Sequence, residues 1–136
     1  IVVAEDDVHM LRIISMWLQR NGHEVCEAPD GLAARDRLVN EQFDILVSDV
    51  NMPGMDGMDL VRWLRLDHKS RLPVILLSSR CDQLAISEQL APFAVEIHPK
   101  PFSPSRLVAL IERKLAEGAD GKTGDMGRDG EREYVN

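Results

Sequence analysis

The sequence predicts an α/β fold in which helices cover both faces of a parallel sheet. Five short apolar runs alternate with segments whose apolar residues recur every three or four positions. The predicted strands are residues 1–4, 23–28, 43–48, 74–78 and 94–98. Alternating strands and helices are typical of right-handed crossovers in a parallel sheet. The third and fourth runs are apolar almost without interruption, as expected of strands covered on both sides. We therefore expect one doubly wound (βα)5 domain.

The helices follow from apolar spacing and from residues that can cap helix ends. They are predicted at residues 8–20, 32–40, 58–66, 84–90 and 103–115. Asn21-Gly22 is a typical helix end, and Asp30 can cap the second helix because its side chain accepts bonds from free amides. Ser103 is a candidate N-cap of the last helix, with Phe102 and Leu107 as a hydrophobic staple around it.

Composition limits the classes of function. The chain has 136 residues, a formal net charge of −7 and 44% hydrophobic residues, which suits one globular domain. A negative segment is poorly suited to nucleic acid, so we expect no direct nucleic-acid binding. No apolar run approaches the about eighteen residues of a membrane span. Cys26 and Cys81 have no CxxC spacing, which fits a reducing, cytoplasmic location.

The two ends of the chain suggest a piece of a longer protein. Ile1 already stands in an apparent buried strand, without a lead-in. From about Glu117 the sequence becomes rich in glycine and charge and poor in large apolar residues. We predict a domain over residues 1–116, and a flexible linker or added tail over residues 117–136.

Polar residues follow the predicted strands at the points where they end. The carboxyl ends of parallel strands meet at one edge of the sheet, where ligands of such folds bind. The residues expected there are Glu5, Asp6, Asp7, Asp49, Ser78 and Lys100. Crowded carboxylates favour a hard cation such as Mg²⁺, and a lysine adds a second positive charge. Such a site suits phosphoryl transfer, which depends on positioning and charge neutralisation.

Each of these signals has an ordinary explanation when taken alone. An acidic triplet after a strand is often the solvated start of a helix. A single Asp in that place is often a turn or cap residue. Ser78 alone is a polar group at a strand end, and Lys100 alone is a surface charge. The prediction depends on their joint occurrence, each at the strand end that one site requires.

These segments resemble the receiver domain of bacterial response regulators. The matching stretches are residues 3–7, 48–57, 72–79 and 100–102, and the resemblance covers roughly residues 1–116. It implies the flavodoxin-like strand order 2-1-3-4-5. It also implies a switch in two-component signalling that accepts a phosphoryl group and loses it slowly, rather than a metabolic enzyme.

The resemblance assigns a role to each site residue. Asp49 would be the phosphoacceptor. Glu5, Asp6, Asp49 and the backbone carbonyl of Asn51 would form the Mg²⁺ site, with Asp6 the more direct ligand of the acidic pair.

Ser78 would be the hydroxyl that turns toward the phosphoryl group and biases a surface formed by the fourth helix, fifth strand and fifth helix. Lys100 would pair with the phosphoryl group, and the Lys100–Pro101 bond would be cis. Gly57 would permit a backbone angle closed to other residues. Ile97 departs from the family pattern, because many receivers place an aromatic residue there.

The implied partners are a histidine kinase or a histidine phosphotransfer protein, with an output domain attached or separate. The parent protein could be a response regulator or a hybrid kinase. The resemblance also implies a second copy of the chain as a partner, in a homodimer that depends on phosphorylation.

Three other interpretations remain. A degenerate receiver would act as a constitutive protein-interaction module. A haloacid-dehalogenase-type phosphatase would need a second Asp two residues after the first, where this chain has Asn51. A nucleotide-binding domain would need a glycine-rich loop after the first strand, where Glu5, Asp6 and Asp7 stand instead.

Overall fold

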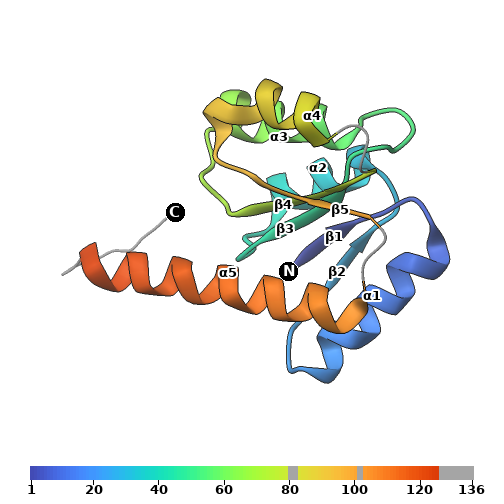
Figure 1. The fold of residues 1–136 in the computed structure, drawn as a ribbon, viewed down its shortest axis with the longest axis vertical. Helices are drawn as coiled ribbons and strands as arrows, with labels where there is room; N and C mark the ends of the chain where they lie inside the picture. The colour runs from blue at the N-terminus through green and yellow to red at the C-terminus, as the bar shows by residue number, and fades with distance from the viewer. Residues whose placement is uncertain (80–82, 101–102, 126–136) are drawn as a thin grey trace.

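The sheet is parallel and has five strands. The computed structural model describes residues 1–79, 83–100 and 103–125, with side chains as far as Glu117. The strands are β1 (Val2–Ala4), β2 (Cys26–Ala28), β3 (Leu46–Asp49), β4 (Val74–Ser78) and β5 (Glu96–Pro99). They lie in the order β2-β1-β3-β4-β5, and every neighbouring pair is parallel (Figure 1). The predicted fold class and strand order are confirmed.

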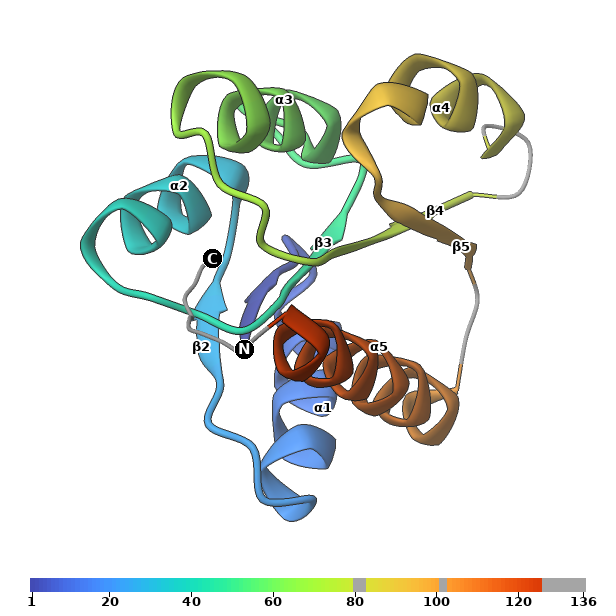
Figure 2. The ribbon, with the colours of Figure 1, turned by 90° about the vertical axis from the view of Figure 1, so that its left-hand side faces the viewer.

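Helices cover both faces of the sheet. They are α1 (Val8–Arg20), α2 (Gly31–Asn40), α3 (Gly57–Arg62), the π-helix η1 (Trp63–Asp67), α4 (Gln83–Leu90), the 3₁₀-helix η3 (Ala91–Phe93) and α5 (Pro104–Asp125). Viewed along the strands, α1 and α5 lie on one face and α2, α3 and α4 on the other (Figure 2). Among the described residues, no helix is long and apolar enough to cross a membrane.

Alternate residues of each central strand enter two separate cores. Leu46 and Leu76 pack toward α2, α3 and α4, whereas Val47 and Ile75 pack toward α1 and α5. All four are fully buried. This two-sided burial accounts for the uninterrupted apolar runs, because side chains on both faces of a central strand leave water.

Several helix ends are built as the sequence predicts. The Asp30 side chain accepts a bond from the amide of Ala33 at 2.8 Å. Asn21 ends α1 and is followed by Gly22 with φ +87°. The Ser103 hydroxyl accepts a bond from the amide of Arg106 at 3.2 Å. The expected staple at Phe102 lies outside the described residues.

β4 has the predicted bounds, whereas the other four strands are shorter than the apolar runs that predict them. β2 begins at Cys26 rather than at residue 23, because β1 is its only partner among the described strands and spans three residues, with Val2 opposite Cys26. Burial continues beyond strand pairing: Ile45, which precedes β3, is fully buried. An apolar run therefore indicates which residues are buried, whereas pairing with the neighbouring strand determines where the strand begins and ends.

The third helix changes type before it ends. The predicted helix over 58–66 continues from α3 into the π-helix η1, where the amide of His68 donates to the carbonyl of Trp63 at 2.9 Å. The rings of Trp63 and His68 stack with centroids 4.9 Å apart. Side-chain periodicity alone does not distinguish the two helix types over one turn.

The last helix is longer than predicted. α5 runs to Asp125, past the expected end at residue 115. The boundary placed after residue 116 therefore does not coincide with a helix end. The role of residues 117–136 as a linker stays a prediction.

Candidate functional site

Parallel register brings the predicted site residues to the carboxyl edge of the sheet. Glu5 follows β1, and Asp49 and Ser78 end β3 and β4. Asp49 lies opposite Leu77 in the sheet. The amide of Lys100 donates to the carbonyl of Ser78 at 2.7 Å, which fixes the backbone of the lysine beside β4.

Three carboxylates and one ammonium form the centre of this site. Lys100 Nζ lies 2.8 Å from Asp49 Oδ1 and 3.4 Å from Glu5 Oε1. Glu5, Asp6 and Asp49 each offer an oxygen atom, and these atoms lie within 4.8 Å of one another. Glu5 and Asp49 are buried, whereas Asp6 is exposed. The site is thus open to solvent on the side of Asp6.

Burial and neighbouring charges alter the protonation of this cluster. Burial raises the pKa of Glu5, and the charge of Asp49 adds to the rise. Burial lowers the pKa of Lys100, but the hydrogen bond and negative charge of Asp49, with the charge of Glu5, raise it to a net value above the ordinary range. Lys100 is therefore a cation at neutral pH and partly offsets the carboxylates.

Ser78 carries a buried polar atom without a partner. Its Oγ is buried and makes no hydrogen bond within the described part of the chain. An unsatisfied buried hydroxyl costs about 1–3 kcal/mol. Ser78 ends β4, and its carbonyl binds the amide of Lys100, whose side chain pairs with Asp49. The Ser78 hydroxyl is therefore able to donate a hydrogen bond to a ligand oxygen at this edge of the sheet.

A hollow of about 350 Å³ opens beside the carboxylates, lined by Asp6, Asn51, Met52, Pro53 and Asp56. Asn51, predicted from the resemblance as a metal ligand through its backbone, is thus placed in the same hollow as Asp6. Several carboxylate oxygens with room for water are what Mg²⁺ requires. The residues present fit this ion.

Two acidic residues near the site have capping roles. Asp7 caps α1, and its side chain accepts bonds from the amides of His9 at 3.0 Å and Met10 at 3.2 Å. The ordinary interpretation of the acidic triplet therefore holds for its third member. Asp56 caps α3 through the amide of Asp59 at 2.8 Å. The sequence analysis gave Asp56 no role of its own, although Asp56 lies in the matching stretch 48–57 and directly before a predicted helix.

The prediction for Gly57 was wrong in its physical reason. The residue with a left-handed backbone in this loop is Gly54, at φ +76°. Gly57 instead permits a close approach: a Cβ atom there would lie 2.4 Å from the carbonyl oxygen of Asp49. The amide of Gly57 also donates to the carbonyl of Val50 at 2.8 Å. Gly57 therefore packs the start of α3 directly against the Asp49 backbone.

One predicted feature lies outside the described residues. The structure describes Lys100 but not Pro101, so the predicted cis bond between them stays a prediction.

These observations define a class: an open parallel α/β domain with a buried, lysine-paired carboxylate at the carboxyl edge of its sheet. The sequence profile of the response regulator receiver domain matches residues 1–112. The chain belongs to the response regulator receiver domain family. Members of this family act as phosphoacceptor switches and bind Mg²⁺ at an acidic pocket.

Similar proteins agree with this assignment. The transcriptional regulatory protein CseB of Streptomyces coelicolor is 34% identical over 125 residues, which cover 92% of this chain and 53% of CseB. The chain spans about half the length of the curated relatives it matches.

Solved receiver domains show the same fold. A Francisella response regulator receiver domain superposes with a TM-score of 0.79 at 28% identity, covering 86% of this chain and 96% of the other. The receiver domain of a histidine kinase from Syntrophus aciditrophicus gives a TM-score of 0.74 at 29% identity, covering 85% of this chain and 89% of the other.

Proposed function

We propose that Asp49 accepts the phosphoryl group in this receiver domain. The observation that carries the proposal is the 2.8 Å contact between Lys100 Nζ and Asp49 Oδ1 inside a cluster of three carboxylates. A buried carboxylate with a fixed cation beside it combines a nucleophile with charge compensation for the incoming oxygens.

The proposed reaction is an in-line displacement. An oxygen of Asp49 attacks phosphorus, and the bond from phosphorus to the donor breaks, with its electron pair leaving on the donor. The donor is a phosphohistidine or a small acyl phosphate. Lys100 supplies positive charge at the attacked group. Glu5, Asp6, Asp49 and the Asn51 carbonyl would hold Mg²⁺, which when bound neutralises phosphoryl oxygens.

Ser78 would report the change at Asp49. The new acyl phosphate adds about two negative charges and acceptor oxygens. The unpaired hydroxyl of Ser78 can then donate to one of them, drawing the end of β4 inward. The Gln83 side chain already ties α4 to β5 by donating to the carbonyl of Ile97 at 3.3 Å. Movement at Ser78 would thus reach the surface formed by α4, β5 and α5.

The relatives indicate the partners. CseB is a transcriptional regulatory protein, and the Syntrophus receiver belongs to a histidine kinase. For this chain we infer a histidine kinase or histidine phosphotransfer protein as donor and an output domain as recipient of the signal, in the cytoplasm. A phosphorylation-dependent homodimer through the α4–β5–α5 surface belongs to the same proposal.

Intact mass spectrometry tests the proposal. The protein is incubated with acetyl phosphate, with and without Mg²⁺, alongside Asp49→Asn. A gain of about 80 Da is expected only in the wild type with Mg²⁺. No gain, with the fold intact and the phosphoryl mimic beryllofluoride also failing to bind, would contradict the proposal and favour the constitutive interaction module. The comparisons with known response regulators do not support that alternative.

A further inference from the structure

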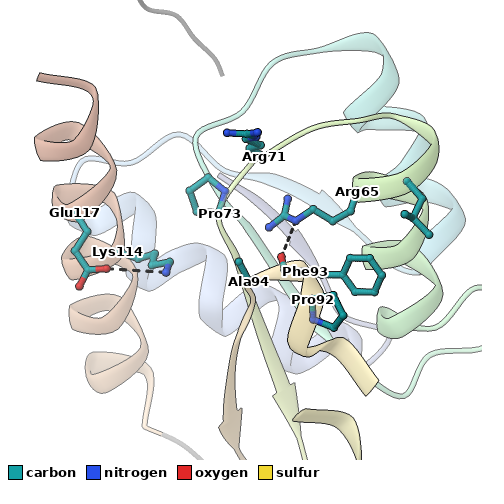
Figure 3. Close-up of a pocket in the computed structure, with 9 residues that line it drawn as sticks. Arg65, Arg71, Pro73, Pro92, Phe93, Ala94, Lys114 and Glu117 are labelled. Atoms are coloured by element: carbon teal, nitrogen blue, oxygen red, sulfur yellow. Dashed lines mark hydrogen bonds and ion pairs between the residues drawn. The ribbon is translucent and has the colours of Figure 1, made fainter. Parts of the chain in front are cut away.

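A second hollow lies at the opposite edge of the sheet from Asp49. It has a volume of about 830 Å³ and is lined by Arg65, Leu66, Arg71, Pro73, Pro92, Phe93, Ala94, Lys114 and Glu117 (Figure 3). Pro73 and Ala94 precede β4 and β5, which places the hollow at the amino ends of these strands. We call it the amino-edge groove. Nothing in the phosphoryl-transfer proposal uses it.

The cation on one wall of this groove is held rigidly. Arg65, in η1, donates through Nε to the carbonyl of Phe93 at 2.8 Å. Its Nη1 donates to the carbonyls of Ser70 at 3.0 Å and Leu72 at 2.8 Å. No described residue accepts a bond from Nη2. The guanidinium is therefore fixed by three backbone bonds with one nitrogen still able to donate, which reduces the entropy lost when it binds an anion.

Positive charge dominates the groove although the chain carries −7 overall. Arg71 is exposed and has no hydrogen bond or ion pair with any residue that the structure describes. Lys114 is already paired with Glu96 at 3.3 Å and with Glu117 at 4.0 Å. Arg65 and Arg71 thus remain as two guanidinium groups without a carboxylate partner among the described residues.

The remaining walls are apolar. Leu66 is 56% exposed and Phe93 is partly buried, and Pro73 and Ala94 line the groove with them. Pockets for small organic ligands span about 300 to 1,000 Å³ and combine apolar walls with a few fixed polar groups. Both the volume and the chemistry of the groove fall in this range.

We propose that the amino-edge groove binds a small organic anion, with its carboxylate, phosphate or sulfonate group at Arg65 and Arg71 and its apolar body against Leu66, Pro73 and Phe93. Guanidinium groups favour oxyanions through charge-assisted bonds. The apolar walls select against bare inorganic anions, which would gain nothing from them.

Binding is measured with 8-anilinonaphthalene-1-sulfonate, a fluorescent aromatic sulfonate, on the folded wild-type chain. The expected result is a saturable, single-site increase in fluorescence. Decanoate should displace the probe, and inorganic phosphate at the same concentration should not. No saturable signal, or equal displacement by inorganic phosphate, would overturn the proposal.

Charge variants locate the site. Arg71→Glu and Leu66→Glu each place a negative charge in the groove through an exposed residue, and each should raise the dissociation constant of the probe about tenfold or more. The matched control is Arg35→Glu, at an exposed arginine of α2 outside the groove. This variant should change the dissociation constant of the probe less than about twofold. Equal effects of Arg71→Glu and Arg35→Glu would show that net charge, not the groove, governs binding.

The site is independent of the phosphoacceptor. Asp49→Asn should bind the probe as the wild type does, even though it gains no phosphoryl group. Loss of probe binding in Asp49→Asn would place the probe at the carboxyl edge and contradict the proposal.

Discussion

Two buried serines show how differently a hydroxyl can be accommodated. Ser15 and Ser78 are each 1% exposed. Ser15 Oγ donates to the carbonyl of Leu11 at 2.8 Å, which satisfies it within α1. Ser78 Oγ has no such partner in the part of the chain that the structure describes. A polar atom left unpaired in this way lowers stability, which is consistent with a role that depends on a ligand.

Replacing these serines should therefore have different effects. Ser78→Ala removes an unsatisfied hydroxyl, so we expect the free energy of unfolding to rise by about 1 kcal/mol. Ser15→Ala removes a hydroxyl that already has a hydrogen-bond partner, so the free energy of unfolding should stay unchanged or fall. Urea denaturation of both variants checks the comparison. If Ser78→Ala proves less stable than Ser15→Ala, the Ser78 hydroxyl makes a stabilising bond in solution.

For single residues, the sequence predicted which ones form the site but not the physical reason for each of them. Glu5, Asp49, Ser78 and Lys100 were predictable because each stands at the end of a strand or just after it, and the ends of parallel strands meet at one edge of the sheet. The need for glycine at position 57 was predictable only in part. A close backbone approach cannot be read from the sequence, because it arises only when the loop and β3 pack together.

Among the elements, the loop after β3 depends on the contact between Gly57 and the Asp49 backbone. Gly57→Ala would force its Cβ to 2.4 Å from the Asp49 carbonyl oxygen. We expect a loss of about 3 kcal/mol in the free energy of unfolding, because the backbone must move at both Gly57 and Asp49. Phosphoryl gain should fall with it, since Asp49 is displaced.

Gly54→Ala is the matched control for this loop. The new methyl group would make an ordinary contact, 3.8 Å from Leu32, but at a backbone φ of +76°. Its cost should be only about 1 kcal/mol. Urea denaturation of the two variants gives the comparison, and equal losses would mean that backbone angle, not close packing, governs both positions.

β5 and α5 are joined by ion pairs around Glu96. Its carboxylate lies 2.9 Å from His98 Nε2, 2.9 Å from Arg113 and 3.3 Å from Lys114. Burial alone would raise the pKa of Glu96, but the bonds from His98 and Lys114 and the charges of Lys114 and Arg113 lower it to about 2. The folded state therefore holds the charged form more strongly than the unfolded chain does.

The sign of the pH dependence follows. Because the folded pKa is depressed, the stabilisation from Glu96 is present above its ordinary pKa of 4.5 and is lost as pH falls toward about 2. Solvent screening limits it to about 1 kcal/mol. Glu96→Gln should remove this part of the pH dependence in urea denaturation, while Glu88→Gln, an exposed residue of α4, should retain it. Identical pH profiles for Glu96→Gln and the wild type would contradict the assignment.

The lengths of elements were less predictable than their existence. β2 is short because of its contact with another element, the three-residue register of β1, which a local pattern does not show. The π-helix η1 coincides with the stacking of His68 on Trp63, five residues apart, and the spacing of apolar residues does not reveal this change of helix type.

For the whole molecule, the alternation of apolar runs was sufficient to predict the sheet, its coverage and the edge that holds the site. The amino-edge groove was not predictable, because its residues come from η1, η3, α5 and the segment before β4, and none of them forms a motif. Its Arg65 appears in the sequence as one more helical charge.

Metal binding should stabilise the whole domain. Three carboxylates against one lysine leave excess negative charge in the folded site, so we expect Mg²⁺ to bind the folded chain preferentially. At a concentration ten times its Kd, the ion should add about 1.4 kcal/mol to the free energy of unfolding. Calorimetry should show a higher Tm with Mg²⁺ than with NaCl of equal ionic strength. Asp6→Asn should lose most of this rise, and Asp36→Asn, an exposed residue of α2, should keep it. An equal rise in Asp6→Asn would place the ion elsewhere.

The most direct test of the central claim is to identify the residue that carries the phosphoryl group. Borohydride reduces an aspartyl phosphate to homoserine, so the protein is treated with acetyl phosphate and Mg²⁺, reduced, digested and sequenced by mass spectrometry. We predict homoserine at position 49 and unmodified Asp6, Asp7 and Asp56. Homoserine at one of these other positions, or at none, would contradict the assignment of Asp49 as the phosphoacceptor.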